Sequence, residues 1–258
     1  LHDTHPLRDG ISPSQPQCFK VERPKSSFAA WYQFFPRSEG ATINPATGKI
    51  VQGTLKTSMA GLERAAAEGF DIVYLPPIFP IGVTNRKGRN NSLIAGPDDP
   101  GSPFGIGSEL GGHDTVDPLL GTMDDFKALC QRAHELGLEI ALDFALQCSP
   151  DHPWVKAHPA WFKHKPDDTI AFAENPPKKY QDIYPIDFNA DMAGIEKEVE
   201  RIMNLWIEAG VTIFRIDNPH TKPVRFWQDV IAAVTKKHPE ILFLAEAFTR
   251  PGMMRALS

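Results

Sequence analysis

Short apolar runs alternate with amphipathic segments along most of the chain. In the amphipathic segments apolar residues recur every three or four positions, which is the spacing of one helical face. The apolar runs are almost continuous, as a parallel sheet covered on both faces requires. They occupy residues 28–35, 71–75, 138–144, 211–216 and 241–245. The pattern therefore predicts an α/β fold in which five strands alternate with helices.

The predicted helices have recognisable ends. Thr122 and Asp125 form a capping pattern in front of an apolar helical face that includes Phe126 and Leu129. Further helical faces cover residues 58–68, 195–206 and 230–234. Glycines that can end a helix follow at positions 69, 137 and 210. Each helix is thus expected to stop just before the next strand begins.

This alternation predicts a partial (β/α)8 TIM barrel that covers about strands 1 to 5 of the eight that closure requires. Two long βα loops follow strands 2 and 3, over residues 79–122 and 145–193, on the face where barrels bind ligands. Residues 1–26, rich in proline, serine and charge, are predicted to be a linker or the tail of a preceding domain. Residues 27–258 are predicted to be the N-terminal part of a catalytic barrel, truncated before strands 6 to 8.

Composition narrows the classes of function. The 258 residues are 41% hydrophobic with a net charge of −5, which supports a sizeable core and leaves no basic stripe for nucleic acid. No run approaches the roughly 20 apolar residues of a membrane span. Cys18, Cys130 and Cys148 are odd in number and widely spaced, so we expect no disulfide framework. A cytoplasmic location fits this pattern best.

Two carboxylates end neighbouring predicted strands. Asp217 follows an apolar run together with Arg215 on the same face, and a guanidinium keeps a nearby carboxylate ionised, as a nucleophile needs. Glu246 follows Leu244 and is flanked by alanines, surroundings that raise the pKa of a proton donor. A retaining glycosidase would hold such a pair about 5 Å apart. Either residue alone is as readily a helix cap or an ion-pair partner, but together they indicate glycosidic chemistry.

Four segments resemble, in order, conserved segments of the α-amylase superfamily, glycoside hydrolase family 13. They are Gly-His-Asp-Thr-Val-Asp-Pro-Leu-Leu-Gly-Thr at 112–122, Leu-Asp-Phe-Ala-Leu-Gln at 142–147, Phe-Arg-Ile-Asp at 214–217 and Ala-Glu at 245–246. The longer stretches 143–154, 174–180, 215–223 and 245–251 are similar to the α-1,4-glucan:maltose-1-phosphate maltosyltransferases of bacterial glucan synthesis. Gln147 and Cys148 stand where amylases commonly have Asn and His, which favours the maltosyltransferases. The resemblance runs from about residue 28 to the C-terminus.

The resemblance implies a role for each matching residue. It implies that Asp217 is the nucleophile and Glu246 the acid/base. It further implies a donor-phosphate pocket of Asn175, Lys178, Tyr180 and Asn218, sugar contacts from Lys87, Gln147 and Arg215, and supporting roles for Asp143, His113 and His220. Without the resemblance, Lys178 reads as a solvated turn residue and Tyr180 as a packing anchor. The histidines lack metal-ligand spacing, and neither a metal nor an organic cofactor is expected.

The expected activity is retaining transfer of maltosyl units from α-maltose 1-phosphate to the non-reducing end of α-1,4-glucans, with release of phosphate. The resemblance also implies a homodimer. Two alternatives stay open, an α-amylase-type glucan hydrolase and an inactive carbohydrate-binding fragment. Enzymes of this superfamily use a third carboxylate from a later strand, which is expected beyond Ser258. These residues alone are therefore expected to be inactive.

Overall fold

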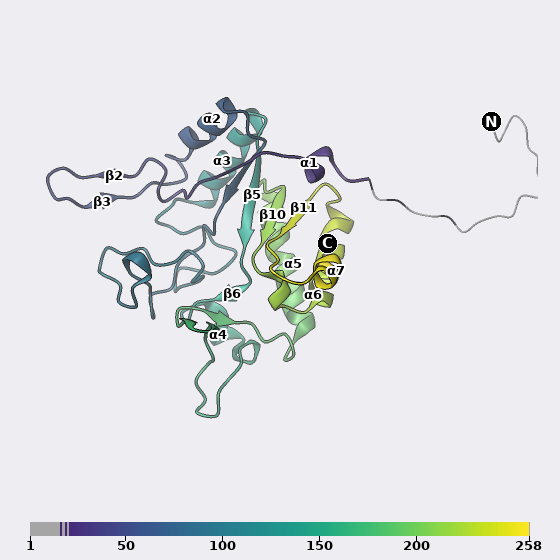
Figure 1. Ribbon diagram of the computed structural model, residues 1–258. Coiled ribbons are helices and arrows are strands. Elements are labelled where there is room, and N and C mark those ends of the chain that lie inside the picture. Colours follow the sequence, from purple (N-terminus) through teal and green to yellow (C-terminus); the bar gives the residue numbers. More distant parts are fainter. Residues whose placement is uncertain (1–15, 17–18, 20, 258) are drawn as a thin grey trace, which may run out of the picture.

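The computed structural model describes residues 16, 19 and 21–257 and is built around one parallel sheet (Figure 1). Its strands are β1 (Trp31–Gln33), β4 (Ile72–Leu75), β5 (Glu139–Phe144), β10 (Ile213–Ile216) and β11 (Leu242–Ala245), and all neighbouring pairs are parallel. The order across the sheet equals the order along the chain. The five predicted strands and their parallel arrangement are confirmed.

Helices connect the successive strands. They are α2 (Met59–Ala67), α3 (Met123–Glu135), α5 (Met192–Glu208) and α6 (Val224–Lys237), and α7 (Pro251–Leu257) follows the last strand. Helix α2 packs beside α3, and α5 beside α6. The capping box at the start of α3 forms as predicted, because the Asp125 amide donates to Thr122 Oγ1 at 3.1 Å and the Thr122 amide donates to Asp125 Oδ2 at 3.0 Å.

The two faces of the sheet differ in character. One face carries side chains such as Leu142 and Phe214, which are buried in the large core beneath the helices. On the other face Ile72, Ala141 and Ile213 form a small second apolar cluster near the beginnings of the strands. Further along the strands this second face becomes polar, with Tyr74, Asp143 and Arg215 at alternate positions. Polar groups therefore collect where the strands end.

Three local predictions were incomplete. The strand expected over residues 28–35 is only three residues long, because β1 pairs with β4 at Trp31–Gln33 alone and α1 (Pro24–Ser27) precedes it. The hairpin of β2 (Thr42–Ile43) and β3 (Ile50–Val51), which projects from the body in Figure 1, was not predicted. Helix α6 is longer than its predicted apolar face, since Phe226 and Trp227 are also buried against the core.

Both long loops lie after the strands for which they were predicted, and they contain short elements of their own. Strand β6 (Gln147–Cys148) pairs with β9 (Tyr184–Pro185), and β7 (Ala173–Asn175) pairs with β8 (Lys178–Tyr180), both antiparallel. The remaining short elements are α4 (Pro153–Ala157) and the 3-10 helices η1 (Arg89–Asn91), η2 (Pro159–Trp161) and η3 (Pro219–Thr221). Pairings of only two or three residues have too little periodicity to be predicted from sequence.

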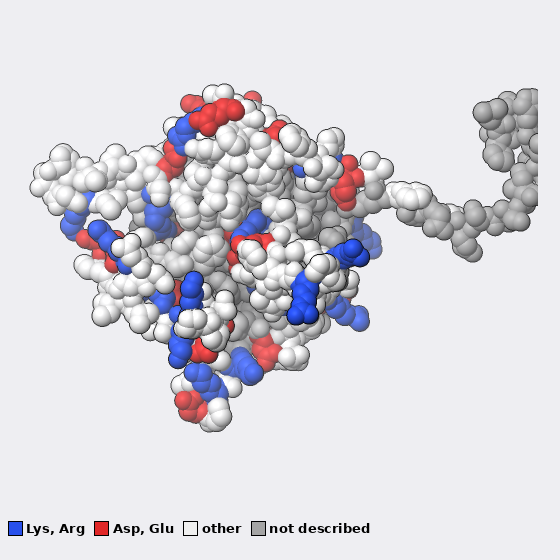
Figure 2. All heavy atoms as spheres, in the orientation of Figure 1, with Lys and Arg blue, Asp and Glu red and all other residues white. Residues whose placement is uncertain are grey.

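Most of the predicted linker, residues 1–26, lies outside the described residues. Its described end contacts the sheet, because Arg23 Nη1 and Lys25 Nζ lie 2.9 and 3.2 Å from the carboxylate of Glu139 at the start of β5. Across the described part of the chain, no helix combines the length and the apolar character that crossing a membrane demands. Lys, Arg, Asp and Glu side chains are interspersed over the face seen in Figure 2.

Candidate active site

The strand register assembles a cluster of charged side chains around Arg215. Parallel pairing of β10 with β5 places Arg215 beside Asp143. Nη1 of Arg215 donates to Asp143 Oδ2 at 2.6 Å and to Asp217 Oδ1 at 2.9 Å. Nη2 of the same guanidinium lies 2.5 Å from Oε2 of Glu246, at the end of β11. One cation thus contacts three carboxylates from three neighbouring strands, and the two predicted catalytic carboxylates lie together.

The pKa values of this cluster follow from burial and from charge. Burial raises the pKa of Asp143 to about 7, although Arg215 and the hydroxyl of Tyr74 both donate to its Oδ2. Its Oδ1 is buried and has no hydrogen-bond partner among the described residues. Burial, and next the neighbouring carboxyl of Asp217, raise the pKa of Glu246. The direction expected for Glu246 is therefore confirmed.

The predicted reason for the Glu246 shift is only partly right. Leu244 was expected to enclose Glu246, but its side chain is 46% exposed at the edge of the sheet. Burial is still the larger cause of the raised pKa of Glu246, and the neighbouring carboxyl of Asp217 contributes in addition.

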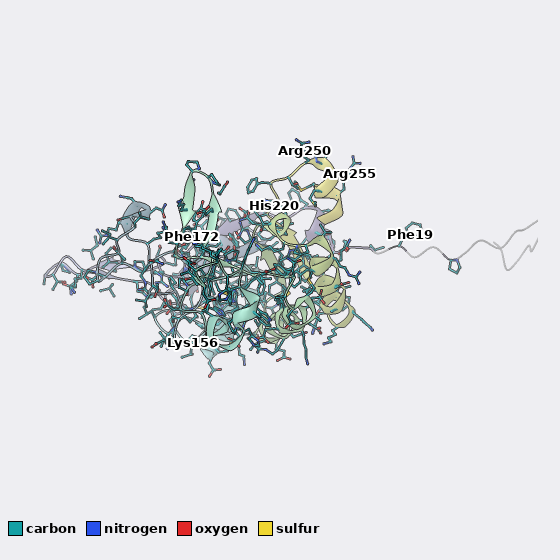
Figure 3. All side chains as sticks on the ribbon, turned by 90° about the horizontal axis from the view of Figure 1, so that it is seen from below. Phe19, Lys156, Phe172, His220, Arg250 and Arg255 are labelled. Atoms are coloured by element: carbon teal, nitrogen blue, oxygen red, sulfur yellow. The ribbon has the colours of Figure 1, made fainter. Side chains whose placement is uncertain are left out.

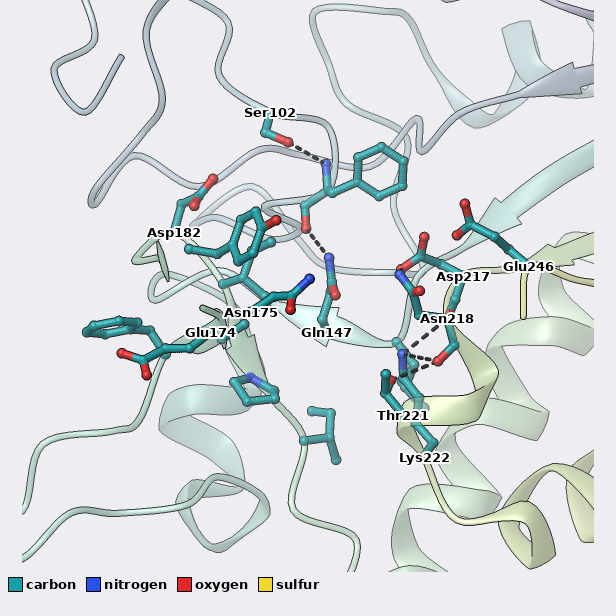
Figure 4. A pocket seen from close by; sticks show the side chains of 18 of the residues that line it. Ser102, Gln147, Glu174, Asn175, Asp182, Asp217, Asn218, Thr221, Lys222 and Glu246 are labelled. Carbon is teal, nitrogen blue, oxygen red and sulfur yellow. Dashed lines mark hydrogen bonds between the residues drawn. The ribbon is translucent and has the colours of Figure 1, made fainter. Parts of the chain in front are cut away.

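A cavity of about 810 Å³ opens beside this cluster at the ends of the strands. Figure 4 shows Asp217, Glu246 and Lys222 on one side, Asn175 on the other, and Gln147 between them. Of the predicted site residues, the cavity is lined by Lys87, Gln147, Asn175, Tyr180, Arg215, Asp217, Asn218, His220 and Glu246. In Figure 3, Phe172 belongs to the second long loop and His220 to the segment after β10, and both line the cavity.

Several lining side chains are held in place by protein partners. Gln147 Nε2 donates to the carbonyl of Phe104 at 3.1 Å. Lys87 is only 6% exposed, and its Nζ donates to Gln181 Oε1 at 3.0 Å. Asn218 has a left-handed backbone with φ of 43°, which turns its amide so that Nδ2 donates to Asp217 Oδ2 at 3.2 Å. These groups are pre-oriented around the cavity.

Three predicted residues lie elsewhere. Lys178 pairs with Asn175 at the tip of the β7–β8 hairpin, where its side chain is exposed to solvent, and it is not among the residues that line the cavity. His113 is buried away from the cavity and can support the site only through the loops. Asp143 lies beneath the cavity and contacts it through Arg215.

Sequence reasoning missed several residues of the site. Lys222 lines the cavity, and its Nζ donates to the carbonyls of Asp217 and Asn218 at 3.1 and 3.2 Å. Tyr74 binds Asp143 from the neighbouring strand. Asp182, which is 5% exposed, lies 3.8 Å from Lys87 Nζ. Strand alternation could have predicted Tyr74, because it lies on the same face of the sheet as Asp143 and Arg215. No sequence pattern predicted the contacts of Lys222.

A second polar cluster, His113 with Cys148 and His152, has the composition of a metal site. The amide of Trp154 donates to His152 Nδ1 at 3.0 Å, so the proton of His152 is on Nε2 and is donated to His113 Nδ1 at 3.0 Å. His113 Nε2 then donates to the carbonyl of Ala145 at 2.9 Å. All four ring nitrogens are thus used in hydrogen bonds, which leaves only the thiol as a free ligand.

Comparison with solved structures places this fold among the α-amylases. The chain is similar to an α-amylase from Lactobacillus plantarum, with a TM-score of 0.69 and 30% sequence identity over 88% of this chain and 47% of that one. It is also similar to a maltogenic α-amylase from Thermotoga neapolitana, with a TM-score of 0.67 and 26% identity over the same shares. The fold of the chain is therefore similar to that of the α-amylases.

Sequence relatives specify the family. The chain is 95% identical, over its full length, to an alpha-1,4-glucan:maltose-1-phosphate maltosyltransferase of Bifidobacterium longum and covers 35% of that protein. It is 59% identical over 254 residues to maltosyltransferase 1 of Streptomyces coelicolor, of which it covers 37%. No family model matches the chain. The resemblance drawn from the motifs is confirmed, and the chain spans about a third of the length of the maltosyltransferases that it matches.

Proposed function

We propose that the complete gene product transfers maltosyl units from α-maltose 1-phosphate to the non-reducing end of α-1,4-glucans and releases phosphate. The observation that carries this proposal is the convergence of Asp217 and Glu246 on Arg215 at one wall of the cavity. The names of the relatives supply the donor and acceptor. A cavity of about 810 Å³ is large enough for a disaccharide.

The proposal includes the architecture of the site. We take the five-stranded sheet as the first five strands of a (β/α)8 barrel, with residues 27–258 as its N-terminal part. The parallel order β1-β4-β5-β10-β11 and the likeness to α-amylases support this reading. The carboxyl ends of the strands then form the catalytic face, where the cavity lies.

In the first step, an oxygen of Asp217 attacks the anomeric carbon of the donor from the side opposite to the phosphate. The bond between that carbon and the phosphate oxygen breaks, and the electron pair leaves with the phosphate. Glu246, whose pKa is raised, donates its proton to the departing oxygen. The product is a β-maltosyl ester on Asp217.

In the second step, Glu246 is a carboxylate and accepts the proton of the acceptor 4-hydroxyl. The acceptor oxygen attacks the anomeric carbon, the ester bond to Asp217 breaks, and the α configuration is restored. Transfer outcompetes hydrolysis if the loops after β4 and β5 exclude water from the ester. Both loops contribute residues to the cavity, among them Ser102 and Tyr180.

The proposed ligand contacts follow from the lining residues. Asn175, Tyr180 and Asn218 supply neutral amide and phenol donors for phosphate oxygens. Lys87 and Gln147 are pre-oriented for sugar hydroxyls.

The proposal also includes a homodimer and a cytoplasmic location. Analytical ultracentrifugation and cell fractionation of the complete gene product test these two parts.

The test incubates the complete gene product with α-maltose 1-phosphate and maltohexaose. We expect stoichiometric phosphate release, and products that are longer by two hexose units each, by mass spectrometry. Asp217→Asn should lower the rate by at least about 10³-fold, because the nucleophile is lost. Asp229→Asn is the matched control, since Asp229 pairs with Arg225 on the surface of α6 and should leave the rate unchanged.

Two outcomes would overturn the proposal. Shortening of maltohexaose without phosphate release would indicate a glucan hydrolase. A full rate in Asp217→Asn would contradict a covalent intermediate on Asp217.

A second experiment traps the intermediate. In Glu246→Ala, we expect α-maltosyl fluoride to leave one maltosyl unit attached to the protein, because fluoride departs without a proton donor while the deacylating base is missing. Peptide mapping should locate that unit on Asp217.

A further inference from the structure

Three positively charged side chains line the cavity, and they differ in what they contact. Arg215 contacts three carboxylates. Lys87 lies 3.8 Å from the carboxylate of Asp182. Lys222 has no carboxylate within 4.0 Å among the described residues, and it touches only the backbone carbonyls of Asp217 and Asn218. Lys222 is therefore the lining cation whose charge no contacting anion neutralises.

The position of Lys222 is set by the turn that follows β10. The chain leaves the strand at Asp217, turns through the left-handed Asn218 and forms η3. The side chain of Lys222 folds back so that Nζ lies 3.1 Å from the carbonyl oxygen of Asp217 and 3.2 Å from that of Asn218. These two bonds tie the ammonium to the backbone of the proposed nucleophile, as Figure 4 shows.

One donor of the ammonium remains. A lysine ammonium has three N–H groups, and two of them point at the carbonyls. Across the described part of the chain, no third acceptor lies within hydrogen-bond distance of Nζ. The half-buried ammonium lines the same corner of the cavity as Asn218, His220 and Thr221. Burial lowers the pKa of Lys222 to about 8, so the group is still largely protonated at neutral pH.

We propose that Lys222 is the cation that binds the anionic leaving group of the donor and so selects a phosphorylated donor over an uncharged one. This inference rests on the proposed maltosyl transfer and adds a residue that determines its donor class. A single charge-assisted N–H···O bond to phosphate is strong in a partly buried site. The two carbonyl bonds hold the ammonium beside the reacting carboxylate before the donor arrives.

The test compares two donors in the complete gene product, α-maltose 1-phosphate and the uncharged α-maltosyl fluoride. For Lys222→Met we expect kcat/KM with the phosphate donor to fall by about 100-fold, mostly through KM, and kcat/KM with the fluoride by less than about fivefold. Inorganic phosphate should also inhibit the fluoride reaction at least about tenfold more weakly in the variant. Lys222→Arg should recover part of the phosphate-donor rate.

Lys197→Met, at an exposed position on α5, is the matched control and should change neither donor. Equal losses for both donors would mean that Lys222 only holds the backbone turn, and no loss for either would remove it from the site. Both results overturn the inference. They are distinct from failure of the proposed function, in which the unmodified protein itself does not release phosphate from maltose 1-phosphate. Thermal melts of each variant exclude simple unfolding as the cause.

Discussion

Two buried polar clusters lie at the same end of the sheet, and they differ in how completely their groups are satisfied. In the cluster of His113 and His152, all four ring nitrogens bond to protein groups. In the cluster around Arg215, one guanidinium is shared by three carboxylates, and Oδ1 of Asp143 has no partner among the described residues. A saturated cluster stabilises the fold, whereas an unsaturated one has capacity left for a ligand.

The two clusters also differ in charge: the histidine cluster is neutral, whereas the cluster around Arg215 contains a permanent cation. Burial lowers the pKa of His113 to about 4 and that of His152 to about 2, so both rings are neutral at pH 7. In the cluster around Arg215 the guanidinium stays protonated, because its carboxylate neighbours raise its pKa. Gly112 shows how closely the histidine cluster is packed, since a Cβ there would lie 2.4 Å from Nε2 of His152. Neither space nor charge is available there for chemistry.

The largest expected effect tests the charged cluster. Arg215→Met should lower the free energy of unfolding by about 3–5 kcal/mol, because it leaves Asp143 buried without its cation. Chemical denaturation measures the change. Adding Asp143→Asn to this variant should recover part of the loss, since the uncompensated charge is then gone. A loss below about 1 kcal/mol in the single variant would show that Arg215 does not sustain Asp143.

The next effect tests the neutral cluster. His152→Leu should cost about 2–4 kcal/mol, because the amide of Trp154 and Nδ1 of His113 both lose their partner. The rate of the proposed maltosyl transfer per folded molecule should stay unchanged, since His152 does not line the cavity. Chemical denaturation measures the free energy of unfolding, and active-site titration gives the rate per folded molecule. A lower rate without a loss of stability would contradict the assignment of the histidine cluster to a purely structural role.

A third prediction uses the pH dependence of stability. The folded pKa of each histidine is depressed, so the unfolded chain binds more protons below about pH 6.5, and stability present above that pH is lost as the pH falls towards 4. Each histidine contributes up to about 1.4 kcal/mol per pH unit. Asp143, with its raised pKa, has the opposite slope between about pH 4 and 7.

Asp143 is present in both the unmodified protein and His152→Leu, so its contribution cancels when the unfolding free energy of one is subtracted from that of the other. The unfolding free energy of the unmodified protein should fall more steeply than that of His152→Leu between pH 6.5 and 4, by at most about 1.4 kcal/mol per pH unit. Urea denaturation at several pH values measures both slopes. Parallel curves would mean that His152 is protonated in the folded protein, contrary to its hydrogen bonds.

The smallest expected effect lies far from both clusters. Thr122→Ala should cost about 1 kcal/mol, because the amide of Asp125 loses its cap at the start of α3. Asp125→Ala should cost a further amount in that background, because the backbone amide of residue 122 then loses its acceptor, Oδ2 of Asp125. Urea denaturation of the single and double variants measures both losses, and no further loss in the double variant would contradict the second bond of the box. Transfer activity should not change in either variant.

Much of the fold was predictable because it depends on local periodicity. The strands and helices follow from the spacing of apolar residues, and the capping box of α3 follows from two side chains three positions apart. The two carboxylates could be placed at strand ends for the same reason. The short hairpins of the long loops could not, because two or three paired residues carry no readable period.

Residue order indicates which side chains lie on the polar face of the sheet, because alternation along a strand sets the face of every residue. The distances between those side chains depend on how the strands and loops pack. Arg215 meets Glu246 because β10 and β11 pair in one register, and Lys222 meets two carbonyls because Asn218 turns the chain back. The β7–β8 hairpin likewise left Lys178 outside the cavity. Such contacts join residues through register and loop conformation, which depend on packing across the whole sheet and are not encoded in any local pattern.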